Sequence, residues 1–550
     1  MGKSKSLEIL SRAVIDRGRA LVVLDGKGEI VDNILAYCIE QQLSRRVLVI
    51  DPQLADWAVG LNLLEPQGEG TDAATHAELV MEAIKKIFGE QHDFMPLLEK
   101  WLPSTAEPLI LRGLTLAEAE EFASGTDPML RHAVLHDLGP DVRRVALRWA
   151  ELAGLRQTEQ AMQTLAVQNR AAVCTAGSTA LAMFGQTKTT IRWREVMDSG
   201  GIVLIRAYQT HDVSQRLAQT IGVTVVQQLM QAARARPKDR CPDAWVVADE
   251  FQSFASETFV RGLAQMRDRH LWFILSNQSF SQLAPVPGLV EAIETNCDGR
   301  LYFALSHRDA ELVVHDLFQG YLSEEHIRWI TRQTKYDPRE TTREIHSQSW
   351  SESESDSDVY MDLTNVGDSV GFSQPCGGHG FLGSYATGSS RGHSSSSGAS
   401  HTTARAQGGG IATVPWYEYK RFLEETSRQF YGIPDLLERC KTWVMTQHVR
   451  RAQFQLSKSR PAIPIVTRFI DEPCIDPVRE VPRFLAKVLP RCARPKAEVL
   501  REIEERRASL LLAYEEAIAE EEARRQASPR ASAATVAERL RTKAARRCAR

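Results

Sequence analysis

Two acidic residues, Asp249 and Glu250, follow directly after the apolar run 244–248 and are the clearest candidates for chemistry in the sequence. An acid at the end of a buried strand can order the shell of a Mg²⁺ ion, and a second carboxylate beside it can polarise an attacking water molecule. A polar residue at the tip of the next apolar run, Gln278 or Asn277, is placed to detect the phosphate that such a water attacks. A surface acidic pair after an ordinary strand is the alternative interpretation.

The opening residues Gly2, Lys3 and Ser4 match the last positions of the phosphate-binding motif G-x-x-x-x-G-K-[ST]. In that motif the backbone amides at a helix N-terminus hold the phosphates, the lysine reaches the terminal phosphates and the hydroxyl binds Mg²⁺. Apolar residues at helical spacing follow as far as Gly18, so a helix is predicted where the motif requires one. A Gly-Lys-Ser triplet also occurs by chance, and its context has to decide.

Apolar runs typical of buried parallel strands must position these residues. A strand is predicted at 20–24, a helix follows as far as Gln42, and a second strand is predicted at 47–50. Helix, strand, helix, strand in this order predicts a parallel α/β sheet. The other candidate strands lie at residues 201–205, 244–248, 271–275 and 300–304, so the sheet is expected to have at least six.

Composition shifts divide the chain into five predicted segments. A first part of the α/β core (1–69) is followed by a helical subdomain rich in Ala, Leu, Glu and Arg (70–185) and by the second part of the core (186–344). Residues 345–411 are rich in Ser and Gly and are predicted to be a disordered linker, because they cannot bury enough apolar surface to offset the entropy of ordering. Residues 412–550 are predicted to be a C-terminal helical region.

Two features stand out in that C-terminal region. The charged run 496–525 has apolar residues at heptad-like intervals and is interpreted either as a coiled coil or as a solvated single helix. Residues 524–550 contain nine basic residues and one acidic residue. This tail is a candidate contact for an anionic partner such as DNA, and a merely solvated tail is the alternative.

The overall composition narrows the possible classes of protein. The chain has 550 residues, of which 43% are hydrophobic and 25% charged, which is ordinary for a globular protein and excludes a fibrous one. Its 67 basic and 70 acidic residues leave a formal charge of −3, so any nucleic-acid-binding surface must be local. Nine cysteines without a C-x-x-C pair argue against a disulfide framework and favour a reducing, cytoplasmic compartment. No apolar run is long enough to span a bilayer.

Taken together, the motifs of residues 1–330 resemble the conjugative coupling ATPases of type IV secretion (TraD/TraG type) and are similar to their relatives, the HerA and FtsK DNA pumps. The strand end 25–29 (Asp-Gly-Lys-Gly-Glu) is similar to the D-x-K-G-[DE] segment of the coupling proteins, and the helical insertion falls where they carry an all-α domain. The other matching segments are Asn62-Leu63-Leu64, the run from Trp245 to Phe251, Met266-Arg267, Asn277-Gln278-Ser279 and Gln282-Leu283.

This resemblance implies a RecA-like P-loop ATPase core of the α/β class with an inserted all-α subdomain, and ATP and Mg²⁺ as its cofactors. It implies that Lys3 and Ser4, next to Gly2, hold the phosphates and the metal. Asp249 would order the metal shell, Glu250 would activate water, and Gln278 would report hydrolysis to DNA-contacting loops.

The resemblance also implies partners. The expected assembly is a homo-hexamer that translocates DNA, with secretion or relaxosome components as possible further partners. In such rings an arginine from a neighbouring subunit stabilises charge on the transferred phosphate. Arg300 is the first candidate for that arginine; Arg308 is another, and Arg267 and Arg269 are weaker. A surface or structural arginine is the alternative for each.

The sequence departs from the family at its start, because the earlier glycines of the phosphate loop and the strand before it are absent. Our hypothesis is that Met1 is an internal start, and that the missing part carries the first half of this Walker A loop. It could also carry a membrane anchor, which would place the protein at the cytoplasmic face of the inner membrane. The alternatives are a soluble HerA-like DNA translocase or helicase, and a catalytically inactive truncated ATPase that binds DNA or a partner.

Overall fold

The computed structural model of the chain divides into two compact units. One unit comprises Met1–Phe303, His448–Phe454 and Pro464–Arg550, and the other comprises Ala304–Gln447 and Gln455–Ile463. The residues that the structure describes are 2–68, 70–89, 95–136, 138, 142–238, 240–286, 288–319, 321–322, 327–346, 357–364, 393–400, 411–457 and 460–548.

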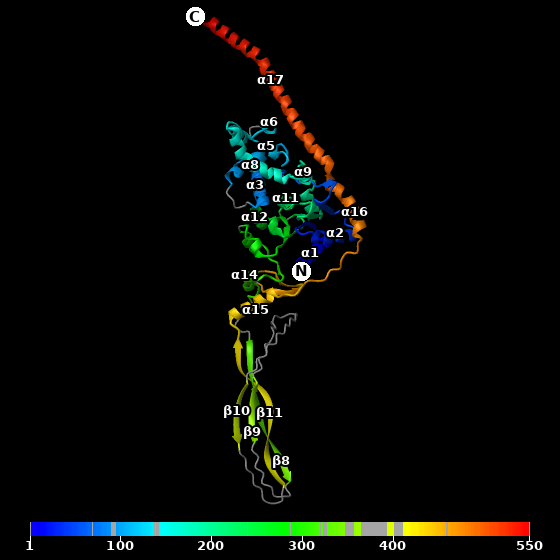
Figure 1. The fold of residues 1–550 in the computed structure, drawn as a ribbon, viewed down its shortest axis with the longest axis vertical. Coiled ribbons are helices and arrows are strands. Elements are labelled where there is room, and N and C mark those ends of the chain that lie inside the picture. The colour runs from blue at the N-terminus through cyan, green and yellow to red at the C-terminus, as the bar shows by residue number, and fades with distance from the viewer. Residues whose placement is uncertain are drawn as a thin grey trace. The chain divides into compact units, whose positions relative to one another are not determined.

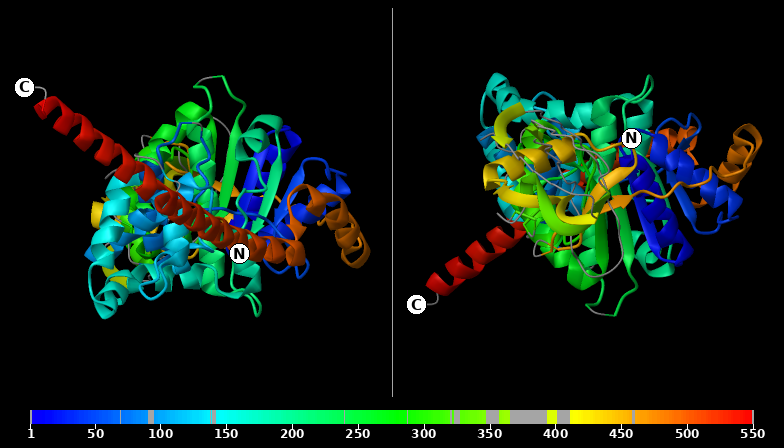
Figure 2. Two further views of the ribbon diagram at one scale, coloured as in Figure 1. Left: turned by 90° about the horizontal axis from the view of Figure 1, so that it is seen from above. Right: turned by 90° about the horizontal axis from the view of Figure 1, so that it is seen from below.

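A five-stranded sheet forms the centre of the first unit, with its strands side by side in the order β2-β4-β1-β5-β6 (Figure 2). Every neighbouring pair is parallel, which confirms the predicted α/β class with a parallel sheet. All six residues of β1 are buried, as expected for a strand covered on both faces. The strands are β1 (Ala20–Asp25), β2 (Val47–Ile50), β4 (Ile202–Arg206), β5 (Ala244–Asp249) and β6 (Leu271–Ser276).

Residues typical of helix ends, a glycine and a capping serine, stand at the ends of two helices around this sheet. Helix α1 (Lys3–Asp16) buries Leu7, Val14 and Ile15 and is followed by Gly18, whose φ of 69° is in the left-handed region that favours glycine. The Ser214 side chain accepts a hydrogen bond from the Leu217 amide at the start of α11. The other helices of this layer are α2 (Glu29–Glu40), α10 (Trp193–Ser199), α11 (Gln215–Arg234), α12 (Glu257–Met266) and α13 (Leu289–Asn296).

A helical insertion lies in the sequence between the short strand β3 (Trp57–Ala58) and β4. It has a hydrophobic core of its own around Trp101, Phe122 and Trp149. The Asn62 side chain donates hydrogen bonds to the carbonyl oxygens of Leu114 and Thr187, at 3.2 and 2.9 Å. The helices are α3 (Ala73–Phe88), α4 (Pro96–Leu111), α5 (Ala119–Phe122), α6 (Met129–His136), α7 (Arg143–Ala153), α8 (Gln157–Cys174) and α9 (Gly177–Phe184). Of these, α3, α5, α6, α8 and α9 are labelled in Figure 1.

The prediction that a sixth strand at 300–304 joins the main sheet is wrong. Residues Arg300–Tyr302 form β7, which belongs to a separate three-stranded sheet with the order β13-β12-β7. Each residue of β7 is only partly buried, so this three-residue strand lacks the full burial typical of a parallel sheet. Its partners are β12 (Arg451–Gln455) and β13 (Ile463–Val466).

In the second unit, helices α14 (His307–Leu317) and α15 (Ile433–Met445) pack on each other. Two long strands, β8 (Ile327–His346) and β11 (Ile411–Phe430), pair antiparallel, and the sequence analysis expected neither of them. Aromatic residues such as Trp416, Tyr417 and Tyr419 favour strand over helix in the segment that was predicted to be helical. In the predicted linker, Ser357–Thr364 (β9) pairs with His393–Ser400 (β10), and most of the rest lies outside the described residues.

The C-terminal helices α16 (Pro477–Val488) and α17 (Lys496–Cys548) belong to the first unit. Phe484, Cys492 and Ile503 are buried in the same hydrophobic core as the central sheet. The first part of α17 therefore packs within the chain and is not the solvated helix or coiled coil that the heptad-like spacing suggested. The basic tail lies in the part of α17 whose side chains are not described.

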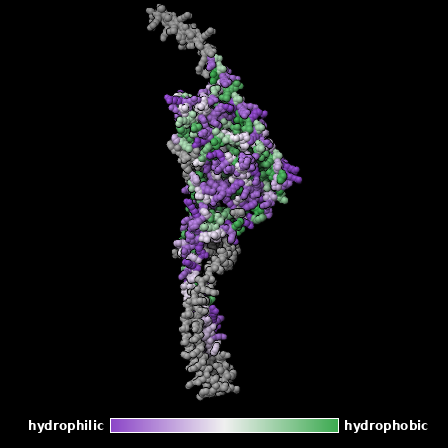
Figure 3. All heavy atoms as spheres, viewed as in Figure 1, coloured by the Kyte–Doolittle hydropathy of each residue, from purple (hydrophilic) through white to green (hydrophobic). Residues whose placement is uncertain are grey.

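Polar residues dominate the visible face in Figure 3, with apolar residues scattered among them. Among the described residues, no helix combines the length and the apolar character that crossing a membrane requires.

Candidate functional site

The candidate site lies where three neighbouring parallel strands end. Strand β5 pairs with β1 through Ala248 and Leu24, and with β6 through Asp249 and Ser276. Carboxyl ends of parallel strands share one edge of the sheet, and ligands of open α/β sheets bind at that edge. This register brings the acidic pair close to Asp25 on one side and to the polar tip of β6 on the other.

Asp249 is a buried carboxylate with one oxygen engaged and one oxygen unpartnered. Its Oδ1 accepts a hydrogen bond from Ser276 Oγ at 2.9 Å and lies 3.5 Å from Lys3 Nζ. Its Oδ2 is buried and has no hydrogen-bond partner among the described residues. A buried carboxylate oxygen without a partner is costly, and a cation or a metal-bound water at this position would satisfy it.

Glu250 adopts a left-handed backbone conformation (φ 51°), which is rare for a residue other than glycine. Its Oε1 receives Lys27 Nζ and Gln278 Nε2, each at 2.6 Å, and Lys3 Nζ at 3.2 Å. Gln252 Nε2 donates to its Oε2 at 2.7 Å. Burial alone would raise the pKa of Glu250, but these hydrogen bonds and the charge of Lys3 together lower it to about 2.

Lys27 is a member of the site that the sequence analysis did not select. Its position is set by Asp25, whose buried carboxylate accepts hydrogen bonds from the Lys27 and Gly28 amides at 2.8 and 2.7 Å and from two further amides in the first turn of α2. A side chain on Gly26 would place its Cβ only 3.1 Å from the Asp249 carbonyl oxygen. The glycine therefore allows the two strand ends to approach, and the D-x-K-G pattern was the signal that could have identified Lys27.

The predicted phosphate-binding residues Gly2, Lys3 and Ser4 lie at the N-terminus of α1. Gly2 precedes the helix, and its carbonyl oxygen accepts a hydrogen bond from the Ser6 amide at 2.9 Å. Ser4 is partly buried in the first helical turn. The first amides of a helix have no partner within it and attract anions, so this end of α1 is suited to phosphate. The Lys3 side chain reaches both members of the acidic pair.

The two candidates for a phosphate-sensing residue occupy different positions. Gln278 reaches Glu250, whereas the Asn277 side chain donates to the Ser279 carbonyl oxygen at 2.9 Å, within its own turn. Of these two, the structure therefore brings Gln278 to the acidic pair.

The arginines proposed to act between subunits lie elsewhere. Arg300 donates hydrogen bonds to the carbonyl oxygens of Glu294 and Cys297 at the end of α13, at 2.5 and 3.4 Å. Arg269 is bound to the Arg236 carbonyl oxygen, and Arg267 is exposed. Arg308 lies in α14 of the second unit. The described contacts bring none of the four to the acidic pair in the same chain, so an action in a neighbouring subunit stays a prediction.

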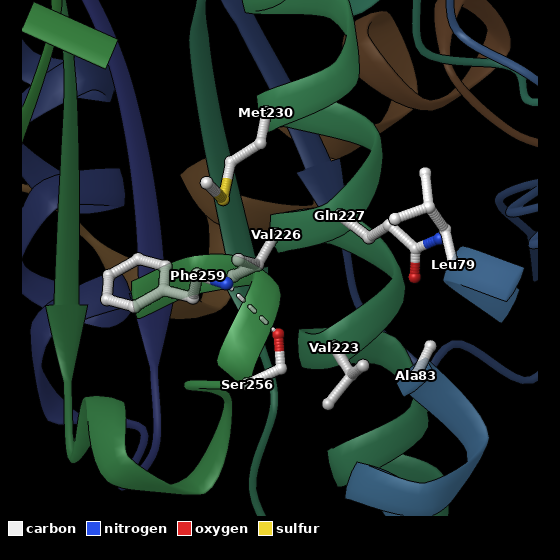
Figure 4. Close-up of a pocket in the computed structure, with 8 residues that line it drawn as sticks. All are labelled: Leu79, Ala83, Val223, Val226, Gln227, Met230, Ser256 and Phe259. Carbon is white, nitrogen blue, oxygen red and sulfur yellow. Dashed lines mark hydrogen bonds between the residues drawn. The ribbon is translucent and has the colours of Figure 1, made fainter. Parts of the chain in front are cut away.

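The assembled residues fit a nucleotide with its metal ion. Two ammonium groups, Lys3 and Lys27, a helix N-terminus and the unpartnered oxygen of Asp249 are the groups that a polyphosphate and Mg²⁺ require. The small apolar cavity in Figure 4 lies between α3, α11 and α12 and has a volume of ≈10 Å³, room for about one water molecule. It is far too small to hold a nucleotide.

No protein-family model matches this sequence, and no curated protein does either. Among solved structures, the chain is similar to the bacterial conjugative coupling protein TrwBΔN70 in its unbound monoclinic form, with 12% identity, 86% of this chain and 84% of that chain covered, and a TM-score of 0.44. It is similar to the plasmid coupling protein TrwB in complex with ADP and Mg²⁺, with 12% identity, the same coverage and a TM-score of 0.41.

A third similar structure is VirB4 of Thermoanaerobacter pseudethanolicus, with 16% identity, 57% of this chain and 80% of that chain covered, and a TM-score of 0.39. A conjugative coupling protein, the class that the motifs resemble, is therefore among these similar structures. Because the identities are low and the TM-scores lie below 0.5, the assignment of the site rests on its own geometry.

Proposed function

We propose that this chain is an ATP-driven DNA translocase, of the coupling type that moves DNA in conjugation or type IV secretion. The observation that supports it most is the convergence of Lys3, Asp249, Glu250 and Gln278, which come from three separate parts of the sequence, at one edge of the parallel sheet. That convergence provides the parts of a phosphoryl-transfer site, in which catalysis is largely positioning and charge stabilisation.

In this proposal each residue has a stated role. Bound Mg²⁺-ATP supplies the phosphoryl group and the metal charge. The α1 N-terminus with Gly2 and Lys3 binds the phosphates, and Ser4 and Asp249 hold the metal and its water shell. Glu250 holds a water molecule in line for attack and accepts its proton. Gln278 contacts Glu250 directly and would transmit the change in that contact to the segment after β6.

Assembly and partners belong to the same proposal. The working form would be a homo-hexameric ring on DNA at the cytoplasmic side of a secretion system, with Arg300 as the first candidate to complete the site of a neighbouring subunit. Secretion or relaxosome components would bind outside the nucleotide site. A soluble HerA-like translocase is the close alternative, because it would use the same site on free DNA.

One observation favours a second candidate function, a nucleotide- or DNA-binding module without turnover. All the hydrogen bonds on Glu250 hold it as a carboxylate with a pKa of about 2, and such a carboxylate is a weak base. Hydrolysis would be favoured if the groups that lower this pKa, which are Lys27, Gln278, Gln252 and Lys3, moved away from Glu250 when the nucleotide binds. Without that rearrangement the site would bind and not hydrolyse.

DNA-stimulated ATP hydrolysis separates the two functions. The proposal predicts hydrolysis that rises when DNA is added and is lost in Glu250→Gln, with ATP binding retained. ATP binding without hydrolysis, with or without DNA, would support the inactive module. A protein that neither binds nor hydrolyses ATP would contradict the assignment of a nucleotide site.

A further inference from the structure

Helix α3 of the helical insertion packs one face against the ATPase core. Leu79 and Ala83 of α3 line the small cavity in Figure 4, opposite Val223 and Val226 of α11 and beside Phe259 of α12. Residues three and four apart share a helix face, so the next positions on this face fall one turn further along α3. Lys86 occupies one of them and faces the core.

Within the described parts of the chain, the hydrogen bond of the Lys86 side chain goes to the turn that carries the acidic pair. Its Nζ donates a hydrogen bond to the Gln252 carbonyl oxygen at 2.9 Å. Burial lowers the pKa of Lys86 to about 8, and no charged group among the described residues offsets that shift. Water solvates a lysine ammonium group strongly, so this group would normally lie at the surface. Its burial against a backbone carbonyl oxygen suggests that Lys86 serves to hold the turn in position.

The Gln252 residue that Lys86 contacts is itself bound to Glu250. Gln252 lies in the short 3-10 turn Phe251–Ser253, and its side-chain amide donates to Glu250 Oε2 at 2.7 Å. The turn is fixed on its other side by Phe254, whose ring occupies the space that a side chain on Gly222 of α11 would need. Lys86, Gln252 and Glu250 thus form a continuous chain of contacts from the helical insertion to the acidic pair.

We propose that Lys86 is a positioning residue through which the helical insertion sets the placement of Glu250. Movement of α3 relative to α11 withdraws the ammonium group from the Gln252 carbonyl and loosens the strained turn at Glu250. A ligand held by the insertion would in this way change the rate of hydrolysis without contacting the nucleotide. The catalytic consequence rests on the proposed function, whereas the mechanical link rests only on the contacts between Lys86, Gln252 and Glu250.

Hydrogen–deuterium exchange of the nucleotide-free protein tests the link directly. The reporting amides are those of Ser253, which donates to the Glu250 carbonyl oxygen, and of Phe254 and Ala255, which donate to that of Phe251. Loss of one hydrogen bond to a charged group in Lys86→Met is expected to speed their exchange about fivefold or more. Lys86→Arg keeps a cationic donor and is expected to restore slow exchange.

The matched control is Lys85→Met, one position earlier on the same helix. Lys85 pairs with Glu99 of α4, inside the insertion, so its loss should leave exchange at 253–255 unchanged. Equal exchange in Lys86→Met and the wild type would overturn the proposal. So would equally fast exchange in both methionine variants, which indicates general loosening of α3. If Lys86→Met does not fold, Gln252→Ala keeps the carbonyl oxygen that Lys86 binds but removes the next contact in the chain, the hydrogen bond from the Gln252 side chain to Glu250 Oε2, and should likewise speed exchange at Ser253.

Kinetics then separate this inference from the proposed function. In a hydrolysing wild type, Lys86→Met should lower kcat and the stimulation by DNA while leaving the affinity for ATP unchanged, and Lys86→Arg should recover part of the rate. If the wild-type protein does not hydrolyse ATP, the proposed function is wrong. The exchange experiment still decides whether Lys86 holds the turn. An unchanged kcat despite faster exchange would show that the link does not reach the chemistry.

Discussion

The ammonium group of Lys27 lies 2.6 Å from Glu250 Oε1, although the two residues come from different strand ends. Lys27 follows β1 and Glu250 follows β5, and the parallel pairing of these strands brings them together. The close carboxylate in turn raises the pKa of Lys27, despite a burial effect that lowers it. The pair therefore holds Glu250 ionised and fixes one of its oxygens before any nucleotide arrives.

Lys27→Met should make Glu250 easier to protonate. With the nearest positive charge removed, the pKa of Glu250 should rise from about 2 toward its ordinary value, because burial is then less well compensated. Glu250 must be ionised to accept a proton, so the acid limb of the rate profile should move to higher pH. In the profile of ATP hydrolysis from about pH 4 to about pH 8, the rate should fall at the acid end in Lys27→Met and stay level there in the wild type.

The control for that change is Lys188→Met. The exposed Lys188 side chain has its Nζ 3.2 Å from Oε1 of the partly buried Glu65, far along the chain from the acidic residues. Its loss should leave the acid limb where it is in the wild type. An acid limb that stays in place in Lys27→Met would mean that Lys27 does not govern the ionisation of Glu250.

Lys3→Met should weaken the binding of ATP by about tenfold or more, because one charge-assisted hydrogen bond to phosphate contributes roughly 1.5–3 kcal/mol. Displacement of a fluorescent ATP analogue gives the dissociation constant. Lys5→Met is the matched control, since Lys5 is two residues further along α1 and its Nζ pairs with Glu8 at 2.9 Å. Equal affinity of Lys3→Met and Lys5→Met for ATP would mean that Lys3 at the α1 N-terminus does not bind the phosphates.

Arg506→Ala should destabilise the first unit by about 3 kcal/mol, because it leaves the buried Glu118 carboxylate without its cation. Arg506 on α17 donates two hydrogen bonds to Glu118 Oε1, at 2.9 and 2.5 Å, and one to the Gly185 carbonyl oxygen. Arg507→Ala removes a more exposed pair with Glu121 and should cost less than about 1 kcal/mol. Denaturant unfolding of both variants measures the difference. Similar costs for the two would mean that α17 is not anchored at Glu118.

His76 should make the stability of the helical insertion depend on pH. Burial lowers its pKa, although the carbonyl oxygens of Leu63 and Leu64 oppose that effect. The folded state thus favours neutral His76. The contribution of His76 to folding stability is therefore complete above the unfolded pKa of about 6.5 and is lost as pH falls below it. In His76→Gln, Tm should decrease less on going to acidic pH than it does in the wild type.

The exposed His211, which pairs with Asp212, gives the control for this pH effect. His211→Gln should leave the pH dependence as it is in the wild type, because an exposed pair contributes little to stability. A His76→Gln protein with the same loss of Tm in acid as the wild type would contradict the assignment.

Much of the site could be predicted from sequence because it depends on local patterns. Continuous apolar runs at 20–24 and 244–248 predict buried strands, and residues at the carboxyl ends of parallel strands must meet at one edge. The choice of Asp249 and Glu250 followed from that rule, and the choice of Lys3 followed from the Gly-Lys-Ser motif at the start of a predicted helix. Lys27 was not selected because a lysine in a D-x-K-G turn is equally well explained as an exposed surface residue, and only the register of β1 against β5 shows what it faces.

Other parts of the fold depend on contacts between distant segments, which a single sequence does not reveal. The heptad-like spacing at 496–525 indicates an apolar face on α17 but not that Val499 and Ile503 would bury it in the main core. The pairing of β8 with β11 joins segments on either side of a long Ser-rich stretch, so no short turn predicts it. At 300–304 the apolar pattern predicted a strand correctly and assigned it to the wrong sheet.

The most direct test of the central claim is ATP hydrolysis by this chain, with and without DNA, in the wild type and in Glu250→Gln. The account predicts hydrolysis that DNA stimulates, and a loss of about 10²–10⁴-fold in kcat in Glu250→Gln with ATP binding retained, because a positioned base contributes that much. Unchanged hydrolysis in Glu250→Gln would contradict the role of Glu250. ATP binding without hydrolysis in the wild type would contradict the proposed translocase and leave a binding module.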